Sequence, residues 1–350
     1  MWNSTRNYFR HLAEGSENGN MSSLLSPLLD MAGKIYGSGI TALRSLYERE
    51  MLPRKKLPFP VISVGNLTWG GTGKTPLVEY LARKISDWRR TPLILTRGYG
   101  QDEVEQMKRH LPRAVIGVGS NRSEVAESLR LQHPIDVAIL DDGLQHWKIR
   151  RDAEIITVNA VNPFGNEKLL PRGILREPLC TLAKGSVIVI SHANLVSAEV
   201  LKQLKERIRK FAPEPPIIEG CLEPLFFYRA KKHLRLAIER LQNHRVTTFS
   251  AIGSPRTFQM LLSRCGIKTV RNFEFGDHHP FSPQELEEIK RVSDSASADE
   301  IVTTEKDYYR SPEVIAGTLD PLILATHLRI FSGEEILNAQ LAQLLGVARQ

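Results

Sequence analysis

After the apolar run Val61-Ile62-Ser63-Val64, the chain reads Thr68-Trp69-Gly70-Gly71-Thr72-Gly73-Lys74-Thr75 and then begins a helical pattern. Glycines in such a loop let backbone N–H groups converge on phosphate oxygens, and the start of the helix adds the positive end of its dipole. In loops of this kind the lysine, here Lys74, reaches the β- and γ-phosphates, and the next hydroxyl, here Thr75, binds Mg²⁺. The stretch therefore predicts a site for ATP and Mg²⁺ formed by residues 68–75.

This loop departs from the usual phosphate-loop pattern at one position. The pattern is Gly-x-x-x-x-Gly-Lys-Ser/Thr, and Thr68 stands where the first glycine belongs. Gly70 and Gly71 can supply the permissive backbone instead, because glycine adopts conformations that are closed to other residues. The alternative interpretation is a glycine-rich turn between a strand and a helix, in which the Lys-Thr pair occurs by chance.

The composition is that of a globular protein: 350 residues, 41% hydrophobic and 25% charged. The net charge of +8 favours anionic partners, although general solubility explains it equally well. Three cysteines lie far apart without a Cys-x-x-Cys pair, so we expect reduced thiols and no zinc site. Helix-turn-helix, RNA-binding and zinc-finger patterns are absent from the sequence, so we expect no nucleic-acid partner.

Residues 21–50 have the periodicity of an amphipathic helix. At about 100° per residue, Asp30, Lys34, Arg44 and Glu48 gather on one face. The opposite face consists of Leu24, Leu25, Leu28, Leu29, Ile35, Tyr36, Ile40, Leu43, Leu46 and Tyr47. A basic cluster at 54–56 follows, and such a helix can lie on the surface of an anionic membrane. The alternative is a helix packed on the protein's own core.

Two further expectations concern the membrane and the start of the chain. The sequence contains no run of 18 or more uncharged apolar residues, so it predicts no transmembrane helix. The first 20 residues are polar and poorly patterned, and Arg6 and Arg10 occur there before any acidic residue. We expect this segment to be disordered or to serve as an organelle-targeting segment.

Strands and helices alternate beyond the proline-rich stretch 53–60, as in a parallel sheet that helices cover on both faces. The first series has predicted strands at 61–65, 92–96, 114–118, 135–141, 154–158 and 186–191, with helices at 73–87, 121–132 and 195–211. A proline-rich boundary at 213–216 precedes extended segments in 217–236. The second series has predicted strands at 245–252, 267–275, 300–303 and 321–325, with helices at 255–265, 282–293 and 333–346.

The predicted fold is therefore an α/β protein with a mostly parallel, P-loop NTPase-like sheet domain and a smaller C-terminal α/β domain. A β-ribbon linker joins the two. The expected divisions are a disordered or targeting segment at 1–20, a membrane-associated helix at 21–56, the phosphate-loop domain at 57–213, and the linker with the smaller domain at 214–350.

Polar side chains follow the predicted strand 135–141. Asp141 and Asp142 end it, and an acidic residue at the tip of a buried strand beyond a phosphate loop is typical of a Mg²⁺ site. Gln145 and His146 follow and add polar groups at the same place. The alternative is an ordinary Asp-Gly turn.

Three other groups of charged residues are candidates for the functional site, and each also has a purely structural interpretation. Asp102 and Glu103 follow the end of the predicted strand 92–96. One of them can accept a hydroxyl proton, or both can lie in a solvated loop. Arg176 lies in a proline-rich loop and can pair with phosphate in a bidentate manner, or it can be a surface residue. In Asp277-His278-His279 a histidine can tune a catalytic carboxylate, or the cluster can cap the next helix.

Taken in order, these motifs resemble the tetraacyldisaccharide 4′-kinase (lipid A 4′-kinase) family, over about residues 24–330. Thr68 is part of that family's phosphate loop. The segments that carry the resemblance are Val64-Gly65-Asn66-Leu67-Thr68, Gly70-Gly71-Thr72-Gly73-Lys74-Thr75-Pro76, Thr96-Arg97-Gly98-Tyr99-Gly100, Asp141-Asp142-Gly143-Leu144-Gln145-His146, Phe164-Gly165-Asn166, Leu170-Pro171, Leu175-Arg176-Glu177-Pro178, Asp277-His278-His279 and Thr304-Glu305-Lys306-Asp307.

The resemblance implies ATP-dependent phosphorylation of the 4′-hydroxyl of tetraacyldisaccharide 1-phosphate, which gives lipid IVA. It implies that Asp102 is the general base and that His278 assists it. By the same resemblance, Lys74 and Thr75 serve ATP and Mg²⁺, and Asp141 and Asp142 lie near the ion. The other implied substrate or phosphate contacts are Glu103, Arg122, Gln145, His146 and Arg176.

The spacing before Asp102 points to a subgroup of this family. Many bacterial members have a longer insertion after Gly-Tyr-Gly, whereas only Gln101 intervenes here. This spacing resembles the plant members, for which a mitochondrial location is implied. A bacterial member is expected at the cytoplasmic face of the inner membrane. We expect a membrane-associated monomer whose substrate is a lipid disaccharide. The alternative function is that of an unrelated P-loop GTPase or ATPase.

Overall fold

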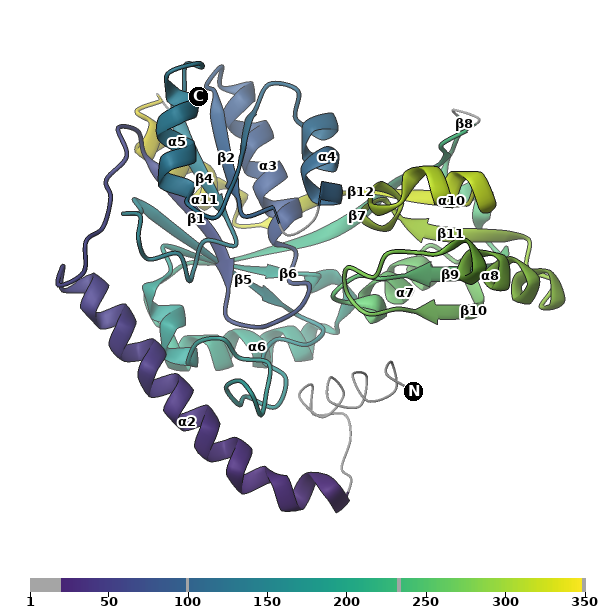
Figure 1. Cartoon of the computed structure of the whole chain (residues 1–350), viewed down its shortest axis with the longest axis horizontal. Coiled ribbons are helices and arrows are strands. Elements are labelled where there is room, and N and C mark those ends of the chain that lie inside the picture. Colours follow the sequence, from purple (N-terminus) through teal and green to yellow (C-terminus); the bar gives the residue numbers. More distant parts are fainter. Residues whose placement is uncertain (1–19, 99–100, 232–233, 348–350) are drawn as a thin grey trace. The chain divides into compact units, whose positions relative to one another are not determined.

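The computed structural model describes residues 20–98, 101–231 and 234–347, and it divides the chain into two compact units (Figure 1). Unit 1 contains residues up to 97, 113–221 and those from 330 onward. Unit 2 contains residues 98–112 and 222–329. The chain passes between the units four times: on either side of the segment 98–112, and within the two long strands β7 (Ile217–Arg229) and β12 (Leu322–Ser332).

Unit 1 is built on a parallel sheet with the strand order β7-β6-β5-β1-β4-β2-β3. Its other strands are β1 (Val61–Asn66), β2 (Pro92–Thr96), β3 (Val115–Val118), β4 (Val137–Asp141), β5 (Ala153–Asn159) and β6 (Val187–Ser191). The central strands are buried over their length, as expected for a parallel sheet under helices. Their carboxyl ends meet at one edge, where the phosphate loop follows β1. The P-loop NTPase-like α/β fold is confirmed.

Helices cover the sheet of unit 1 (Figure 1). Leu204 and Ile208 of α6 pack on β5 and β6 in one apolar cluster, and Ala126 of α5 packs on β2 and β4 in another. Helix α3 contacts β1, β2 and β4. The elements are α2 (Asn20–Glu48), α3 (Lys74–Asp87), α5 (Arg122–Arg130), η1 (Leu179–Lys184), η2 (Ala193–Leu195), α6 (Ala198–Phe211) and α11 (Glu334–Leu345).

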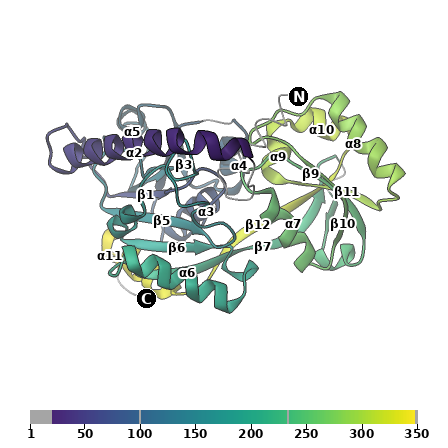
Figure 2. The same cartoon turned by 90° about the horizontal axis from the view of Figure 1, so that it is seen from below.

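Helix α2 runs along the outside of unit 1 (Figures 1 and 2). Two of its charged side chains pair with the body of this unit. Asp30 pairs with Arg172, and Arg44 Nη1 lies 2.6 Å from Glu177 Oε2. Gly37 permits the close approach, because a Cβ there would lie 2.4 Å from the side chain of Leu169. The predicted helix is present, and its charged face contacts the body of unit 1.

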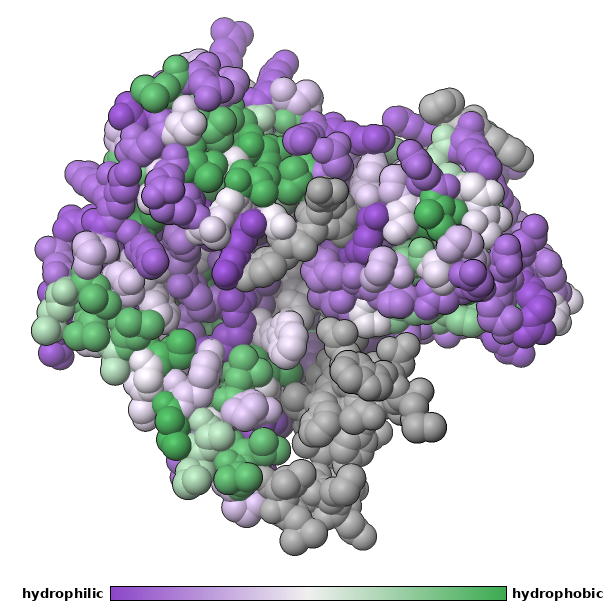
Figure 3. All heavy atoms as spheres, viewed as in Figure 1, coloured by the Kyte–Doolittle hydropathy of each residue, from purple (hydrophilic) through white to green (hydrophobic). Residues whose placement is uncertain are grey.

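The outer side of α2 is apolar, as the hydrophobic side chains along this helix in Figure 3 illustrate. Leu28, Met31, Ile35 and Leu43 are exposed, and Ile35 is 67% accessible. None of the described helices is long and apolar enough to cross a membrane. The predicted targeting segment 1–20 lies outside the described residues except for Asn20, the first residue of α2.

Unit 2 has a smaller parallel sheet with the order β10-β9-β11-β12, and β8 pairs with β7 in antiparallel fashion. Its strands are β8 (Leu234–Leu236), β9 (Arg245–Ser250), β10 (Lys268–Glu274) and β11 (Glu300–Thr304). Its helices are α4 (Gln101–His110), η3 (Ile238–Leu241), α7 (Pro255–Arg264), α8 (Pro283–Ser295), α9 (Glu305–Arg310) and α10 (Pro312–Thr318).

No helix was predicted at α4, and a solvated loop was one of the two interpretations given for Asp102 and Glu103. It is strongly polar, and its buried side chains are only Val104 and Met107 among residues 103–110, followed by Leu111. It packs against α9 and so belongs to unit 2, although residues 57–213 were predicted to form one domain. Two helical turns with so few apolar residues carry too weak a periodicity to be recognised.

The last helix, α11, falls in unit 1 rather than in the C-terminal domain predicted for 214–350. Tyr80 of α3 donates a 2.6 Å hydrogen bond to Glu334, and Lys84 lies 3.2 Å from the same carboxylate. Burial, and then the hydrogen bond to Glu334, raise the pKa of Tyr80 above its ordinary value.

Candidate active site

The phosphate loop of residues 68–75 obtains its curvature from two glycines. Gly70 has a φ of 114° and Gly73 has a φ of 77°, which are conformations that favour glycine. Thr68 instead forms an antiparallel bridge with Leu175, and the Trp69 N–H donates to the carbonyl of Ile174 at 2.7 Å. The first glycine of the usual pattern is therefore unnecessary here, because Thr68 lies in extended backbone that any residue can adopt.

Polar side chains at the ends of neighbouring strands hold this loop. Asn66 Nδ2 donates to the carbonyl of Thr68 at 2.7 Å, and Asn159 Nδ2 donates to that of Gly71 at 3.0 Å. Ser191 Oγ donates to the carbonyl of Thr72 at 2.9 Å. The sequence analysis assigned these three side chains no role, although each is a buried polar residue at the carboxyl end of an apolar strand. That position is the signal by which they could have been found.

The predicted lysine faces a cluster of charges from four segments. Lys74 Nζ donates to Asn66 Oδ1 at 3.0 Å and lies 3.6 Å from Asp142 Oδ1. Arg176 Nη1 contacts both oxygens of the same carboxylate, at 2.9 and 3.1 Å. Arg122, at the start of α5, donates to the main-chain carbonyl of Asp142 at 3.3 Å. The fold thus brings together four residues that the sequence proposed separately.

The charges in this cluster control two protonation states. Burial opposes ionisation of Asp142, but Lys74 and Arg176 outweigh it and hold the pKa of Asp142 below its ordinary value. Burial and then the charge of Arg122 lower the pKa of His146 to about 4. His146 is therefore neutral at physiological pH and can accept or donate a hydrogen bond without adding charge.

Asp141 and Thr75 provide the oxygen donors expected of a Mg²⁺ site. Asp141 is the last residue of β4, is 5% exposed and pairs in register with Val64 of β1. Thr75 is the second residue of α3. A carboxylate and a hydroxyl suit Mg²⁺, which keeps several waters and phosphate oxygens as its other ligands. Groups of three or more His, Cys, Asp or Glu side chains suited to a metal do not occur among the described residues, as expected for such a sparse set.

A second layer connects helix α2 with the loop that carries Arg176. Tyr36 of α2 donates to the carbonyl of Arg176 at 3.0 Å. Gln145 Nε2 donates to Asn66 O at 3.2 Å and to Glu177 Oε1 at 2.9 Å, and the other oxygen of Glu177 binds Arg44. Gln145 therefore acts here as a bridge within the protein.

Unit 2 contains the predicted base and its histidine. Asp102 is the second residue of α4, and Glu103 follows it. Lys306 Nζ lies 2.9 Å from Glu103 Oε1 and 3.6 Å from Asp277 Oδ1. Burial lowers the pKa of Lys306, but the charges of Glu103 and Asp277 outweigh this and raise it, so the ammonium is retained. Lys306 thus ties the first turn of α4 to the segment of His278, a role that the sequence analysis did not assign.

The loop around His278 is held by Asp307. Asp307 accepts hydrogen bonds from the Ala251 N–H at 3.0 Å and from Thr304 Oγ1 at 2.7 Å. The His278 N–H in turn donates to the Ala251 carbonyl at 3.1 Å, and His278 has a φ of 61°. His279 Nε2 lies 2.9 Å from Glu285 Oε1, within the capping box of α8. The two histidines therefore have different roles. His279 supports the start of α8, and His278 remains the candidate for the histidine that assists the base.

The comparisons with known proteins agree with this arrangement. The family model described as "Tetraacyldisaccharide-1-P 4'-kinase" matches residues 25–106 and 101–346. The chain belongs to this family. A "Probable tetraacyldisaccharide 4'-kinase, mitochondrial" of Arabidopsis thaliana is 38% identical over 342 residues, which is 87% of either chain. The "Tetraacyldisaccharide 4'-kinase" of Halothermothrix orenii is 31% identical over 313 residues, 80% of this chain and 81% of its own.

A solved structure supports the fold of this tetraacyldisaccharide 4′-kinase family member. LpxK from Aquifex aeolicus, in complex with ATP, superposes with a TM-score of 0.68 at 26% identity, over 93% of this chain and 99% of its own. The predicted resemblance to plant members is confirmed, since the identity to the Arabidopsis protein exceeds that to the Halothermothrix protein. The two segments matched by the family model overlap at residues 101–106, where the spacing before Asp102 is short.

Proposed function

We propose that this chain is an ATP-dependent kinase that phosphorylates the 4′-hydroxyl of tetraacyldisaccharide 1-phosphate and forms lipid IVA. The observation that carries the proposal is the cluster of Lys74, Asp142, Arg176 and Arg122 around a phosphate loop in a member of this family. Phosphoryl transfer requires positioning and neutralisation of charge rather than covalent participation of the protein. Three cations around the loop suit that task.

We assign the residues of unit 1 to the nucleotide. The backbone of residues 68–73 surrounds the phosphates, and Lys74 moves from Asn66 to the β- and γ-phosphates. Arg122 and Arg176 contact phosphate oxygens, and His146 hydrogen-bonds as a neutral group. Thr75 and Asp141 would hold Mg²⁺, with Asp142 beside them, and the bound ion would supply neutralisation of charge on the phosphates.

We assign the acceptor side of the reaction to unit 2. The carboxylate of Asp102 takes the proton of the 4′-hydroxyl while the hydroxyl oxygen bonds to the γ-phosphorus. The bond from the γ-phosphorus to the bridging oxygen of ATP breaks, and ADP leaves. His278 tunes that carboxylate, and Glu103 contacts the substrate. Lys306 is a positioning residue that holds the turn of Asp102 near the segment of His278.

The test of the activity is transfer of radiolabelled γ-phosphate from ATP to tetraacyldisaccharide 1-phosphate. We expect a labelled lipid product and stoichiometric ADP, with ADP release dependent on the lipid. ATP hydrolysis that is the same with and without the lipid would indicate an unrelated P-loop ATPase.

Replacing Lys306 by Met should lower kcat by about tenfold to a hundredfold, because the turn that carries Asp102 loses its anchor. The KM for ATP should stay unchanged, since the phosphate loop belongs to unit 1. Lys306→Arg should restore part of the rate. Steady-state kinetics with both substrates measures this, and an equal loss in kcat and ATP affinity would contradict a positioning role.

We also propose that the protein works as a monomer on a membrane surface, in the mitochondrion of a plant or at the cytoplasmic face of a bacterial inner membrane. The support is the orientation of α2, whose charged residues Asp30 and Arg44 pair with unit 1 while four of its apolar side chains, those of Leu28, Met31, Ile35 and Leu43, remain exposed. A helix with this polarity can insert its apolar side into the boundary of the bilayer, near the acyl chains of the substrate.

Replacing Ile35 by Glu should weaken binding to phospholipid vesicles by about tenfold or more, which corresponds to the burial of one large aliphatic side chain. Thr41→Glu is the matched control, because Thr41 is also exposed but lies roughly 120° around the helix. Vesicle flotation measures the difference. An equal loss of vesicle binding in both variants would show that the effect comes from the change in net charge alone.

A further inference from the structure

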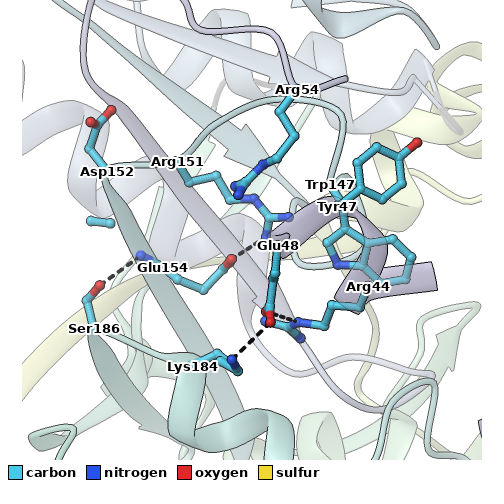
Figure 4. Close-up of a pocket in the computed structure, with 11 residues that line it drawn as sticks. Arg44, Tyr47, Glu48, Arg54, Trp147, Arg151, Asp152, Glu154, Lys184 and Ser186 are labelled. Atoms are coloured by element: carbon cyan, nitrogen blue, oxygen red, sulfur yellow. Dashed lines mark hydrogen bonds and ion pairs between the residues drawn. The ribbon is translucent and has the colours of Figure 1, made fainter. Parts of the chain in front are cut away.

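A second polar pocket lies in unit 1, at the edge of the sheet opposite to the phosphate loop (Figure 4). It has a volume of about 210 Å³. Ala153 and Ser186, at the amino ends of β5 and β6, form one side, and the last turn of α2 forms another. The phosphate loop follows the carboxyl end of β1, so this pocket is separate from the nucleotide site.

Three of the residues that line the pocket carry a buried hydrogen-bond donor that has no acceptor. Arg151 Nε and Trp147 Nε1 are both in this condition, and each of these side chains is only 7% exposed. Arg54 Nε is a third buried donor without an acceptor, and its side chain extends toward Arg151 in Figure 4. A buried donor without a partner costs about 1–3 kcal/mol. Three around one cavity indicate that an acceptor belongs there.

The charges of the pocket leave one guanidinium unpaired. Arg44 and Lys184 each lie 3.0 Å from the carboxylate of Glu48, and Arg151 pairs with Glu154. Arg54 forms no ion pair within the described part of the chain. Burial and then the charge of Arg151 lower the pKa of Arg54, so an anion beside it would relieve both effects.

Glu154, which pairs with Arg151, is a buried carboxylate of the pocket. Burial raises its pKa against the pull of Arg151, and its Oε1 also faces no partner. In the protonated form this oxygen becomes another donor.

We propose that this pocket binds a phosphate group, held by the guanidinium groups of Arg54 and Arg151 and by the indole N–H of Trp147. A tetrahedral oxyanion offers several acceptors at once, and arginine matches it in a bidentate manner. The group comes either from free phosphate or from the headgroup of an anionic phospholipid. The support for the second source is that two exposed apolar residues, Met51 and Leu43, lie close in the sequence to the pocket residues Arg54 and Arg44.

Calorimetric titration with inorganic phosphate tests the first source, with the full-length protein carrying Lys74→Ala to weaken the phosphate loop. Flotation with phosphatidylcholine vesicles, with and without phosphatidylglycerol, tests the second. For whichever of the two probes binds to the protein, Arg54→Gln should weaken that binding about tenfold or more. Trp147→Phe, which removes the N–H donor without a change of charge, should weaken the same binding by a smaller factor.

Arg150→Gln is the matched control for charge. Arg150 is a neighbouring arginine that pairs with Glu50 at the surface and does not line the pocket. Binding of inorganic phosphate that depends on Arg54 assigns the site to soluble phosphate, and dependence seen only with phosphatidylglycerol assigns it to a headgroup. Equal effects of Arg54→Gln and Arg150→Gln, or no binding of either probe, would overturn the proposal and leave a pocket filled by water. The kinase assay is independent of either outcome.

Discussion

Replacing Lys74 by Ala is expected to lower the rate of phosphate transfer by about 10³-fold or more. Lys74 is the cation in the loop that can follow the transferred phosphoryl group, and a preorganised charge of this kind contributes several kcal/mol to the transition state. Its ammonium is already held between Asn66 Oδ1 and Asp142 Oδ1, at 3.0 and 3.6 Å. The binding of ATP therefore needs only a short movement of the side chain.

Lys84→Ala is the matched control for this result. Lys84 lies on the same helix, α3, but pairs with Glu334 of α11. We expect near-normal turnover of Lys84→Ala in the radiolabelled assay and similar melting temperatures for both variants. A rate like that of the wild type in a folded Lys74→Ala protein would remove the assignment of the phosphate loop.

Replacing Asp102 by Asn should lower kcat by about 10²- to 10⁴-fold, the range contributed by a general base, with little change in the KM for ATP. The isosteric amide keeps the start of α4 but cannot accept the proton of the hydroxyl. Rapid-quench kinetics separates this chemical step from the release of product.

Glu105→Gln is the control for charge on α4, because Glu105 is exposed and pairs only with Lys108 among the contacts seen for its side chain. This variant should retain normal activity. If Asp102→Asn also retained it, the base would have to be another acid, with Glu103 the first to examine.

Much of the fold was readable in the sequence. The strands of unit 1 are long apolar runs that end in polar or glycine residues, so β1, β2, β4 and β6 were placed within two residues. Helix α4 was not, because its stability comes from contact with α9 rather than from its own pattern. The return of α11 to unit 1 likewise depends on a long-range contact, that of Tyr80 with Glu334.

The candidate site was predictable in its parts. Lys74, Asp142 and Arg176 were identified from motifs, but only their arrangement explains why Asp142 stays ionised and His146 stays neutral. Asn66 and Ser191 were passed over although each ends an apolar strand, because the sequence does not show that their side chains reach the carbonyls of the phosphate loop. In the sequence, Lys306 was only part of a motif that supported the family resemblance. Its distances to Glu103 and Asp277 in the fold are what indicate a role for it.

Local sequence was sufficient for the phosphate loop, since its glycines, lysine and threonine act through neighbouring backbone and one helix start. It was also sufficient to recognise an amphipathic helix in residues 21–50. The folded chain was needed to establish which side of that helix faces outward, because charged partners such as Glu177 and Arg172 come from more than a hundred residues away. The same holds for the pocket at Arg54 and Arg151. Burial and ion pairing depend on residues that are far apart in the sequence, so the periodicity of one segment cannot predict them.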